Sequence, residues 1–252
     1  MNFDEVRNAP SPTKPALLAD TKELANVTRD LTKANLKKLM GISDNLAALN
    51  HARFQALQAT AKARGSKPAA LAFNGDVYLG LDANSLANDD LDFAQDRIRI
   101  LSGLYGLLRP LDAIEPYRLE MGSKLANQRG KNLYEFWGTK ISAELKKILK
   151  THTDKTIVNL ASIEYFSAVD QSVLSGFNII TPIFKEEKDG QLRQLQFYAK
   201  RARGEMARWA IQKRIDKAQA LKKYSVGGYK FDKAASDETT WLFTRPQPPK
   251  KT

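Results

Sequence analysis

Apolar residues recur along this chain at two spacings, one typical of helices and the other of strands. A spacing of three to four residues, bounded by capping residues, predicts a helix. Strict alternation, or a short apolar run such as 156–160, predicts a strand. We expect helices at about 16–28, 32–40, 44–60, 91–108, 132–150, 163–173 and 201–222, and strands at about 69–73, 76–81, 156–160, 177–185, 191–199 and 240–244.

These elements follow one another without a steady strand–helix–strand rhythm. That order favours an α+β fold with a mixed β-sheet and several surrounding helices. No shift in composition marks an internal boundary, so we expect a single domain over residues 1–245. The segment 246–252 is rich in proline and lysine, which predicts a flexible tail.

The composition adds a strong positive charge to this picture. Forty lysines and arginines against twenty-eight acidic residues give a net charge of +12, which favours polyanionic partners. The absence of cysteine excludes thiolate nucleophiles and thiolate metal sites, and His51 and His152 have no partner at metal-ligand spacing. No apolar run is long enough to cross a membrane, and no secretory signal pattern opens the chain. We therefore expect a cytoplasmic monomer without a metal or cofactor.

The segment 31–55 has the pattern of two short helices joined by a tight turn. Thr32 can cap the first helix, Gly41 can end it in a left-handed conformation, and Ser43 or Asp44 can cap the second. The apolar faces expected to pack are formed by Leu36, Leu39 and Met40 in the first helix and by Leu46, Leu49 and Phe54 in the second.

The turn itself resembles the hairpin of helix-hairpin-helix DNA-binding proteins. That family has a glycine, an aliphatic residue, a second glycine and an alanine four positions on; here Ser43 replaces the second glycine. Unpaired amides at a helix start can hold a phosphate oxygen without reading bases, although Asp44 places an anion beside them. The alternative is an ordinary hairpin packed on the core. The DNA-binding residues we expect here are Lys37, Lys38, Gly41, Ile42, Ser43 and Asn45.

A second basic element lies between residues 200 and 223, where nine lysines and arginines accompany two acidic residues. On one continuous helix, Arg203, Arg214 and Lys217 would lie within about sixty degrees of one another, and Lys200 would extend this strip. An arginine there can hold a phosphate in a forked geometry; the alternative is a solvated face. The phosphate contacts that we expect here are Lys200, Arg201, Arg203, Arg214 and Lys217.

Five stretches combine turn glycines with polar and aromatic residues: 73–80, 101–112, 116–122, 133–137 and 158–166. Together with 198–209 they resemble the YaaA family of bacterial peroxide-resistance proteins, over about 2–245. The resemblance implies a cytoplasmic protein made under peroxide stress, which limits damage to DNA and proteins by keeping free iron low. It also implies DNA binding through a helix-hairpin-helix element and a positive cleft. Family members usually begin with an apolar strand and Ser-Pro-Ala-Lys ahead of the segment matching Asn2; whether that strand precedes this sequence stays open.

The polar stretches also leave an enzymatic alternative open. Carboxylates beside arginines and a lysine suit acid–base chemistry on a nucleotide-like or sulfur-bearing molecule, with Glu164, Lys200 and Arg203 as the candidate catalytic residues. Familiar phosphate-loop, nucleophile-elbow and zinc motifs are absent. Two competing interpretations are a salt-bridge network that fixes the fold and an iron-handling or regulatory partner protein. The cleft on the enzymatic interpretation would be lined by Asp76, Tyr105, Arg109, Arg118, Glu120, Ser162, Glu164, Tyr165 and Lys200. We favour nonspecific binding of double-stranded or structured DNA and lean away from an enzyme.

Overall fold

The structure, a computed structural model, describes residues 1–4, 10–60 and 62–249. Its internal contacts divide the chain into two compact units. The first consists of residues 1–73, 95–146 and 162–174, and the second of residues 74–94, 147–161 and 175–252. Helices α6 (Asn88–Arg97) and α8 (Lys140–Thr151) contribute residues to both. The end of the predicted tail, 250–252, lies outside the described residues.

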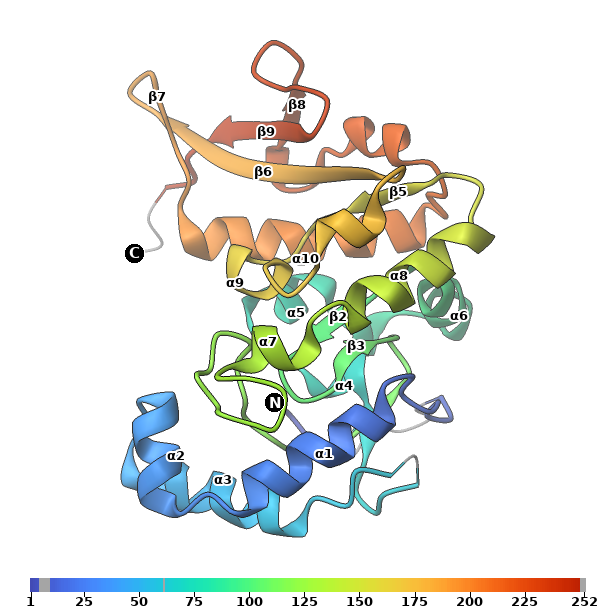
Figure 1. Cartoon of the computed structure of the whole chain (residues 1–252). Helices are drawn as coiled ribbons and strands as arrows, with labels where there is room; N and C mark the ends of the chain where they lie inside the picture. Colours follow the sequence, from blue (N-terminus) through green and yellow to red (C-terminus); the bar gives the residue numbers. More distant parts are fainter. Residues whose placement is uncertain (5–9, 61, 250–252) are drawn as a thin grey trace. The chain divides into compact units, whose positions relative to one another are not determined.

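The first unit combines helices with two short strand pairs (Figure 1). Its helices are α1 (Leu18–Arg29), α2 (Lys33–Met40), α3 (Asp44–Ala56), α4 (Ala69–Ala72), α7 (Leu133–Trp137) and α9 (Ile163–Phe166), with the 3-10 turn η2 (Gln171–Leu174). The antiparallel pairs are β1 (Lys67–Pro68) with β4 (Ala113–Ile114) and β2 (Ile100–Ser102) with β3 (Gly106–Leu108). Gly106 makes the turn before β3 possible, because its φ is +69° and a Cβ there would lie 2.7 Å from the Trp137 ring.

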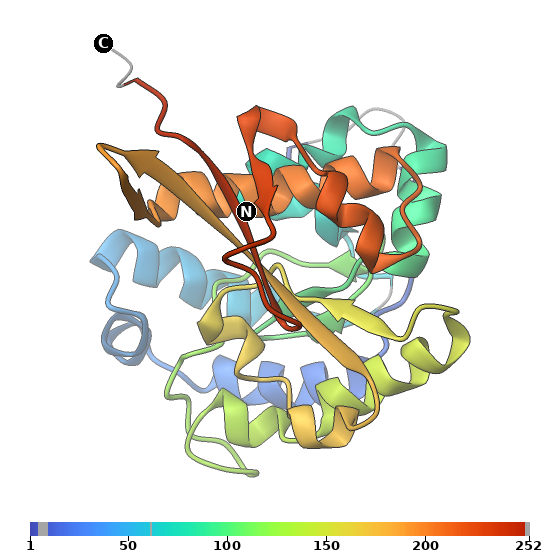
Figure 2. The same cartoon turned by 90° about the horizontal axis from the view of Figure 1, so that it is seen from above.

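The second unit is built on a mixed sheet in the order β5-β6-β9-β8, with β7 pairing to β6. Its strands are β5 (Thr156–Val158), β6 (Asn178–Lys188), β7 (Gln191–Arg193), β8 (Lys230–Asp232) and β9 (Thr240–Pro246). β6 is parallel to β5 and β9, whereas β7 and β8 pair antiparallel to β6 and β9. Figure 2 shows the long β6 and β9 lying side by side. The expected α+β class with a mixed sheet is confirmed.

Helix α10 (Gln196–Gln212) packs on the sheet and against α5 (Asp76–Leu81). Two glycines allow the helices to approach closely: a Cβ on Gly204 would lie 1.8 Å from the Val77 carbonyl oxygen, and one on Gly80 would lie 2.2 Å from that of Arg201. The core beside them is aromatic, with the rings of Phe184, Tyr224, Tyr229, Trp241 and Phe243 buried. Short 3-10 turns complete the unit: η1 (Ala83–Ser85), η3 (Ala218–Lys223) and η4 (Val226–Gly228).

Several predicted elements were wrong in type. The predicted strands 69–73 and 76–81 are helices α4 and α5, because a short apolar run fits a buried helix as well as a buried strand. The predicted helix 91–108 ends at Arg97, and the β2–β3 hairpin follows it. The predicted strand 191–199 stops at Arg193, where α10 soon begins.

Other predicted elements were right in type but wrong in extent. The helix expected over 132–150 is interrupted at Gly138, whose φ of +46° ends α7 before α8 starts. The segment 163–173 divides into α9 and η2. The helix expected over 201–222 ends at Gln212, and this shortening changes the predicted phosphate-binding strip.

Candidate nucleic-acid interface

Helices α2 and α3 of the first unit form a hairpin whose caps are local. The Thr32 hydroxyl accepts the Asn35 amide at 3.1 Å, and the Asn35 side chain accepts the Thr32 amide in return. Gly41 ends α2 at φ 62°, a left-handed conformation that costs glycine little. Of the two residues expected to cap α3, Ser43 does so, accepting the Leu46 amide at 3.4 Å.

The turn leaves a set of main-chain donors at the start of α3. The amides of Gly41 and Ile42 both donate to the Lys37 carbonyl, at 2.9 and 3.3 Å. Ile42 is buried and anchors the turn, while the next three residues are exposed. Within the described part of the chain, three successive amides have no acceptor: those of Ser43, Asp44 and Asn45. They lie at the positive end of a 13-residue helix, a position that favours an anion.

The charges around this turn are mostly positive. Lys33, Lys37 and Lys38 are exposed on α2, and Asp44 is the only acidic residue between positions 33 and 45. The Lys37 ammonium lies 2.9 Å from the Asp44 carboxylate. This pair is well exposed, so it contributes little to stability. It nevertheless neutralises part of the negative charge next to the free amides.

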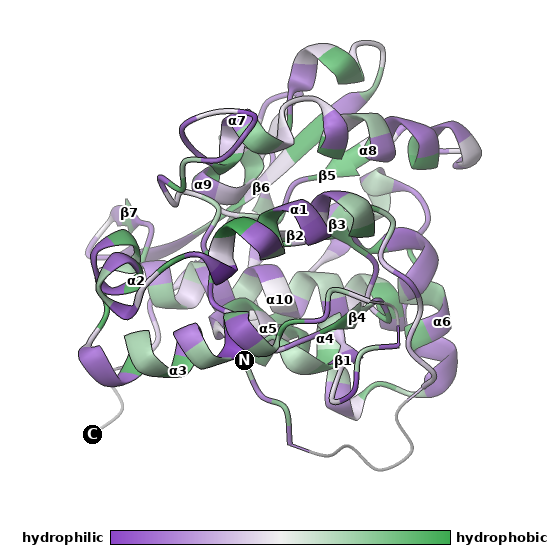
Figure 3. Ribbon diagram, turned by 60° about the horizontal axis from the view of Figure 1, so that its bottom comes forward, coloured by the Kyte–Doolittle hydropathy of each residue, from purple (hydrophilic) through white to green (hydrophobic). Residues whose placement is uncertain are grey.

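The apolar faces of the hairpin were only partly predicted. Leu36 and Phe54 are buried as expected, but Leu46 and Leu49 are 40% and 45% exposed. The expectation for those two leucines was wrong, because α3 turns a different face inward. That face is formed by Ala47, Asn50 and Phe54. Figure 3 shows α3 with hydrophilic and hydrophobic turns interspersed.

The second basic element does not form one strip. Lys200 and Arg203 lie on α10, which ends at Gln212. Arg214 then adopts a left-handed φ of 52°, and Lys217 is the residue before η3. The prediction that Arg203, Arg214 and Lys217 share a helix face was therefore wrong. A residue in the left-handed region redirects the chain, so helical spacing no longer applies beyond it.

Carboxylates hold three arginines of this segment. Arg214 lies 2.6 Å from Asp90 and also caps the end of α10 by donating to the Ile211 carbonyl at 2.7 Å. Its hydrogen bond holds the pKa of Asp90 below the usual range. The other two pairs are Arg201 with Glu205, at 3.3 Å, and Arg208 with Asp82, at 3.7 Å.

Three of the phosphate contacts expected in this segment are not held in this way. No carboxylate lies within ion-pair distance of Lys200, Arg203 or Lys217 in the described ranges 1–4, 10–60 and 62–249. Arg203 is half-buried, and burial lowers the pKa of its guanidinium. Of the phosphate contacts expected in this segment, these three side chains are therefore the ones free to meet an external anion.

The residues expected to line one enzymatic cleft are divided between the units. Asp76 and Lys200 belong to the second unit, as does the separate catalytic candidate Arg203. The remainder belong to the first: Tyr105, Arg109, Arg118, Glu120, Ser162, Glu164 and Tyr165. The three candidate catalytic residues thus do not meet within a single unit.

Some of the first-unit residues do cluster around α9. Ser162 caps this helix, and the Glu164 carboxylate accepts the Gly122 amide at 2.9 Å. Burial, with Glu164 nearby, raises the pKa of Tyr165 to about 12. The Arg118–Glu120 pair, at 3.0 Å, is exposed. A tyrosine with such a pKa stays protonated at neutral pH, so Tyr165 can donate a hydrogen bond but is a poor base.

Two other members of that set hold the fold together. Arg109 forms an ion pair at 3.0 Å with Asp112, whose side chain is almost fully buried and also accepts the Thr13 hydroxyl. The buried Tyr105 hydroxyl accepts the Glu115 amide at 3.0 Å. For these residues the interpretation as a structural network is the better supported one.

Metal-ligand groups and membrane-spanning helices are both missing from the described part of the chain. No group of three or more histidine, cysteine, aspartate or glutamate side chains there is arranged to hold a metal ion. None of its helices combines the length and the apolar character needed to cross a membrane.

Comparison with known proteins gives a consistent result. Residues 1–235 match the family model described as peroxide stress protein YaaA. A UPF0246 protein of Maricaulis maris is 53% identical over 248 residues, covering 98% of this chain and 93% of that protein. UPF0246 proteins of Caulobacter vibrioides and Saccharophagus degradans are 53% and 49% identical, over 94% and 98% of this chain and 91% and 96% of their own lengths.

Proposed function

Because the chain belongs to the peroxide stress protein YaaA family, we propose that it binds the backbone of double-stranded or structured DNA without strong base specificity. It does so in the cytoplasm under peroxide stress, and it also limits damage linked to free iron. The observation that carries DNA binding is the set of three unpaired amides at Ser43, Asp44 and Asn45. The link to iron rests on the resemblance to the family.

The amides suit a phosphate for two physical reasons. They are fixed by the hairpin, so little freedom is lost when a phosphate oxygen accepts from them. They also lie at the positive end of α3, where an anion is favoured. Because each nucleotide offers the same phosphate, contacts of this kind position the protein without reading sequence. Lys37 and Lys38, in the last turn of α2, add positive charge that the phosphates of any duplex can neutralise.

The second unit offers further cations for the same purpose. Lys200, Arg203 and Lys217 are free of carboxylates among the described residues, whereas Arg214 is held by Asp90. We therefore expect Arg203, rather than Arg214, to be the arginine of this segment that contacts phosphate. A forked guanidinium can donate to two phosphate oxygens at once.

A fluorescence anisotropy titration of a labelled duplex at several salt concentrations tests this function. If about six phosphates are contacted, the slope of log affinity against log salt should be about −5. Lys37→Gln and Lys38→Gln should each reduce the slope by roughly one unit, because each removes one cation from the DNA contact. A flat salt response by the folded protein would refute the proposal.

The enzymatic alternative keeps one observation in its favour: among the residues that the structure describes, Lys200 and Arg203 have no carboxylate partner, while Arg201 and Arg208 are paired. Single variants to Gln distinguish the two functions when DNA affinity and peroxide survival are measured together. If these residues only neutralise phosphates, affinity and survival should fall in parallel. A variant that keeps its DNA affinity but loses protection, in cells lacking the native protein, would favour catalysis.

A further inference from the structure

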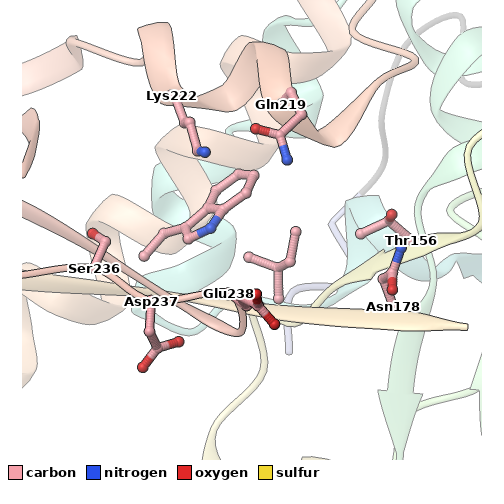
Figure 4. A pocket seen from close by; sticks show the side chains of 9 residues that line it. Thr156, Asn178, Gln219, Lys222, Ser236, Asp237 and Glu238 are labelled. Carbon is pink, nitrogen blue, oxygen red and sulfur yellow. The ribbon is translucent and has the colours of Figure 1, made fainter. Parts of the chain in front are cut away.

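A cavity of about 550 Å³ lies in the second unit, between the N-terminal ends of the parallel strands and η3. Figure 4 shows Lys222 and Gln219 entering from η3, and Thr156 and Asn178 from strands β5 and β6. The loop between β8 and β9 supplies Glu238, and β9 supplies Trp241. The hairpin proposed to bind DNA contributes no residue to this cavity, so the function of the cavity is a separate question.

Lys222 is held over aromatic rings rather than by an anion. Its ammonium lies 4.7 Å from the centre of the Trp241 ring and 5.3 Å from that of Phe231. No carboxylate lies within ion-pair distance of it in the part of the chain that the structure describes. Ring faces orient an ammonium but leave its N–H donors unfilled. Lys222 is thus positioned to receive an acceptor from the cavity.

Trp241 presents a second unfilled donor to the same space. Its side chain is only 2% exposed, yet its indole N–H has no acceptor among residues 1–4, 10–60 and 62–249. The indole nitrogen is not fully enclosed by protein atoms, so it stays accessible from the cavity that Trp241 lines. A largely buried donor normally finds an acceptor, because leaving it unpaired costs free energy. An acceptor from water or a ligand is therefore required here.

The remaining wall is polar and of mixed charge. Within the described residues, four side chains make no hydrogen bond: those of Thr156, Asn178, Gln219 and Glu238. Asp237 differs, because its carboxylate is engaged in capping its own loop, accepting the Thr239 and Thr240 amides at 2.7 and 2.6 Å. Glu238 is therefore the carboxylate that remains for a ligand.

We propose that this cavity binds a small organic anion that also carries hydroxyl or amine groups. A carboxylate or phosphate oxygen of the ligand accepts from Lys222 and from the Trp241 indole. A hydroxyl or ammonium group donates to Glu238, and the two side-chain amides satisfy the remaining polar atoms. A pocket of this volume suits a metabolite rather than a polymer. Amino acids and sugar phosphates share this chemistry.

Saturation-transfer NMR on the full chain tests the site, with L-glutamate and glucose 6-phosphate as the two organic anions and glucose as a fragment. Inorganic phosphate, which has no carbon-bound protons to observe, is added as a competitor and its binding is measured by loss of the organic anion's signal. We expect saturation transfer to at least one organic anion, and weaker binding of glucose and of phosphate. The probe that binds identifies the anionic group as a carboxylate or a phosphate. Binding of inorganic phosphate as tight as that of the organic anion would contradict the requirement for hydroxyl or amine groups.

Variants assign the binding to this cavity. Lys222→Met keeps an unbranched side chain over the rings but removes the charge, and should weaken binding by about tenfold or more. Trp241→Phe keeps the ring and removes the N–H, and should weaken it several-fold. Lys223→Met is the matched control, since Lys223 is an exposed neighbour outside the cavity wall. No transfer to either organic anion, or equal binding by a folded Lys222→Met protein, would overturn the proposal.

Discussion

Substitution of Asp44 can test whether main-chain amides, rather than side chains, hold the phosphate. Asp44 is the first residue of α3, a position where proline is well tolerated because its fixed φ suits the first helical turn. Ser43 before it has φ −65° and ψ 162°, the extended conformation that a residue preceding proline requires. Asp44→Pro therefore removes one amide donor without breaking the helix. Asp44→Asn removes the same carboxylate and keeps the amide.

The comparison of these two variants isolates one hydrogen bond. A bond from an amide to a charged acceptor contributes about 1.5–3 kcal/mol, and every 1.4 kcal/mol changes affinity by about tenfold. Asp44→Pro should therefore bind DNA about ten- to one-hundredfold more weakly than Asp44→Asn. Asp44→Asn itself should bind as well as the unchanged protein or better, since a negative charge near the phosphate is lost and Lys37 is released from its pair.

Anisotropy titrations with one labelled duplex at several salt concentrations measure both effects. The salt slope should be the same for Asp44→Pro and Asp44→Asn, because an amide carries no net charge and releases no counterion. Circular dichroism and a urea unfolding curve show whether the variants are folded. Equal affinities of the two folded variants would refute the contact to the Asp44 amide. Weaker binding by Asp44→Asn would mean that the hairpin does not face DNA.

Three further results are expected. Gly204→Ala should lower the free energy of unfolding by about 1–3 kcal/mol, since its Cβ meets a carbonyl of α5. Gly75→Ala meets nothing within 4 Å and should cost less, so equal urea midpoints of the two variants would contradict this. The lowered pKa of Asp90 means that its carboxylate stabilises the fold at pH values above its unfolded pKa, and that this contribution is lost as pH falls through its folded pKa. Asp90→Asn should therefore flatten the acid side of a plot of unfolding free energy against pH. An unchanged plot would argue against the Arg214 contact. Arg203→Gln should weaken DNA binding more than Arg214→Gln, and the reverse order in anisotropy titrations would show that Asp90 releases its arginine to DNA.

Features that depend on a few neighbouring residues were determined by the sequence. The hairpin is the clearest case, because Thr32, Gly41 and Ser43 act within one helical turn of the positions they cap. The α+β class followed in the same way from the order of apolar patterns, and the excess of lysine and arginine is a property of composition alone. These signals do not depend on what the rest of the chain contacts.

Tertiary packing decided the features that a local pattern leaves open. The apolar runs of α4 and α5 suited either a strand or a helix. In the structure α5 is a helix, and Gly80 and Gly204 allow it to cross α10 closely. The end of α10 is another such feature: just beyond it, Arg214 pairs with Asp90, a residue 124 positions away. Sequence spacing could not show that contact.

The cavity at Lys222 shows the same limit for a binding site. Trp241 and Lys222 lie on different elements, and neither belongs to a recognisable motif. They meet because η3 packs beside the mixed sheet, whose strand order brings together segments far apart in the chain. Local sequence determined which turns and helix ends could form. Only the three-dimensional packing determined which polar groups were left without partners, because partners are set by distance in space and not by position in the chain.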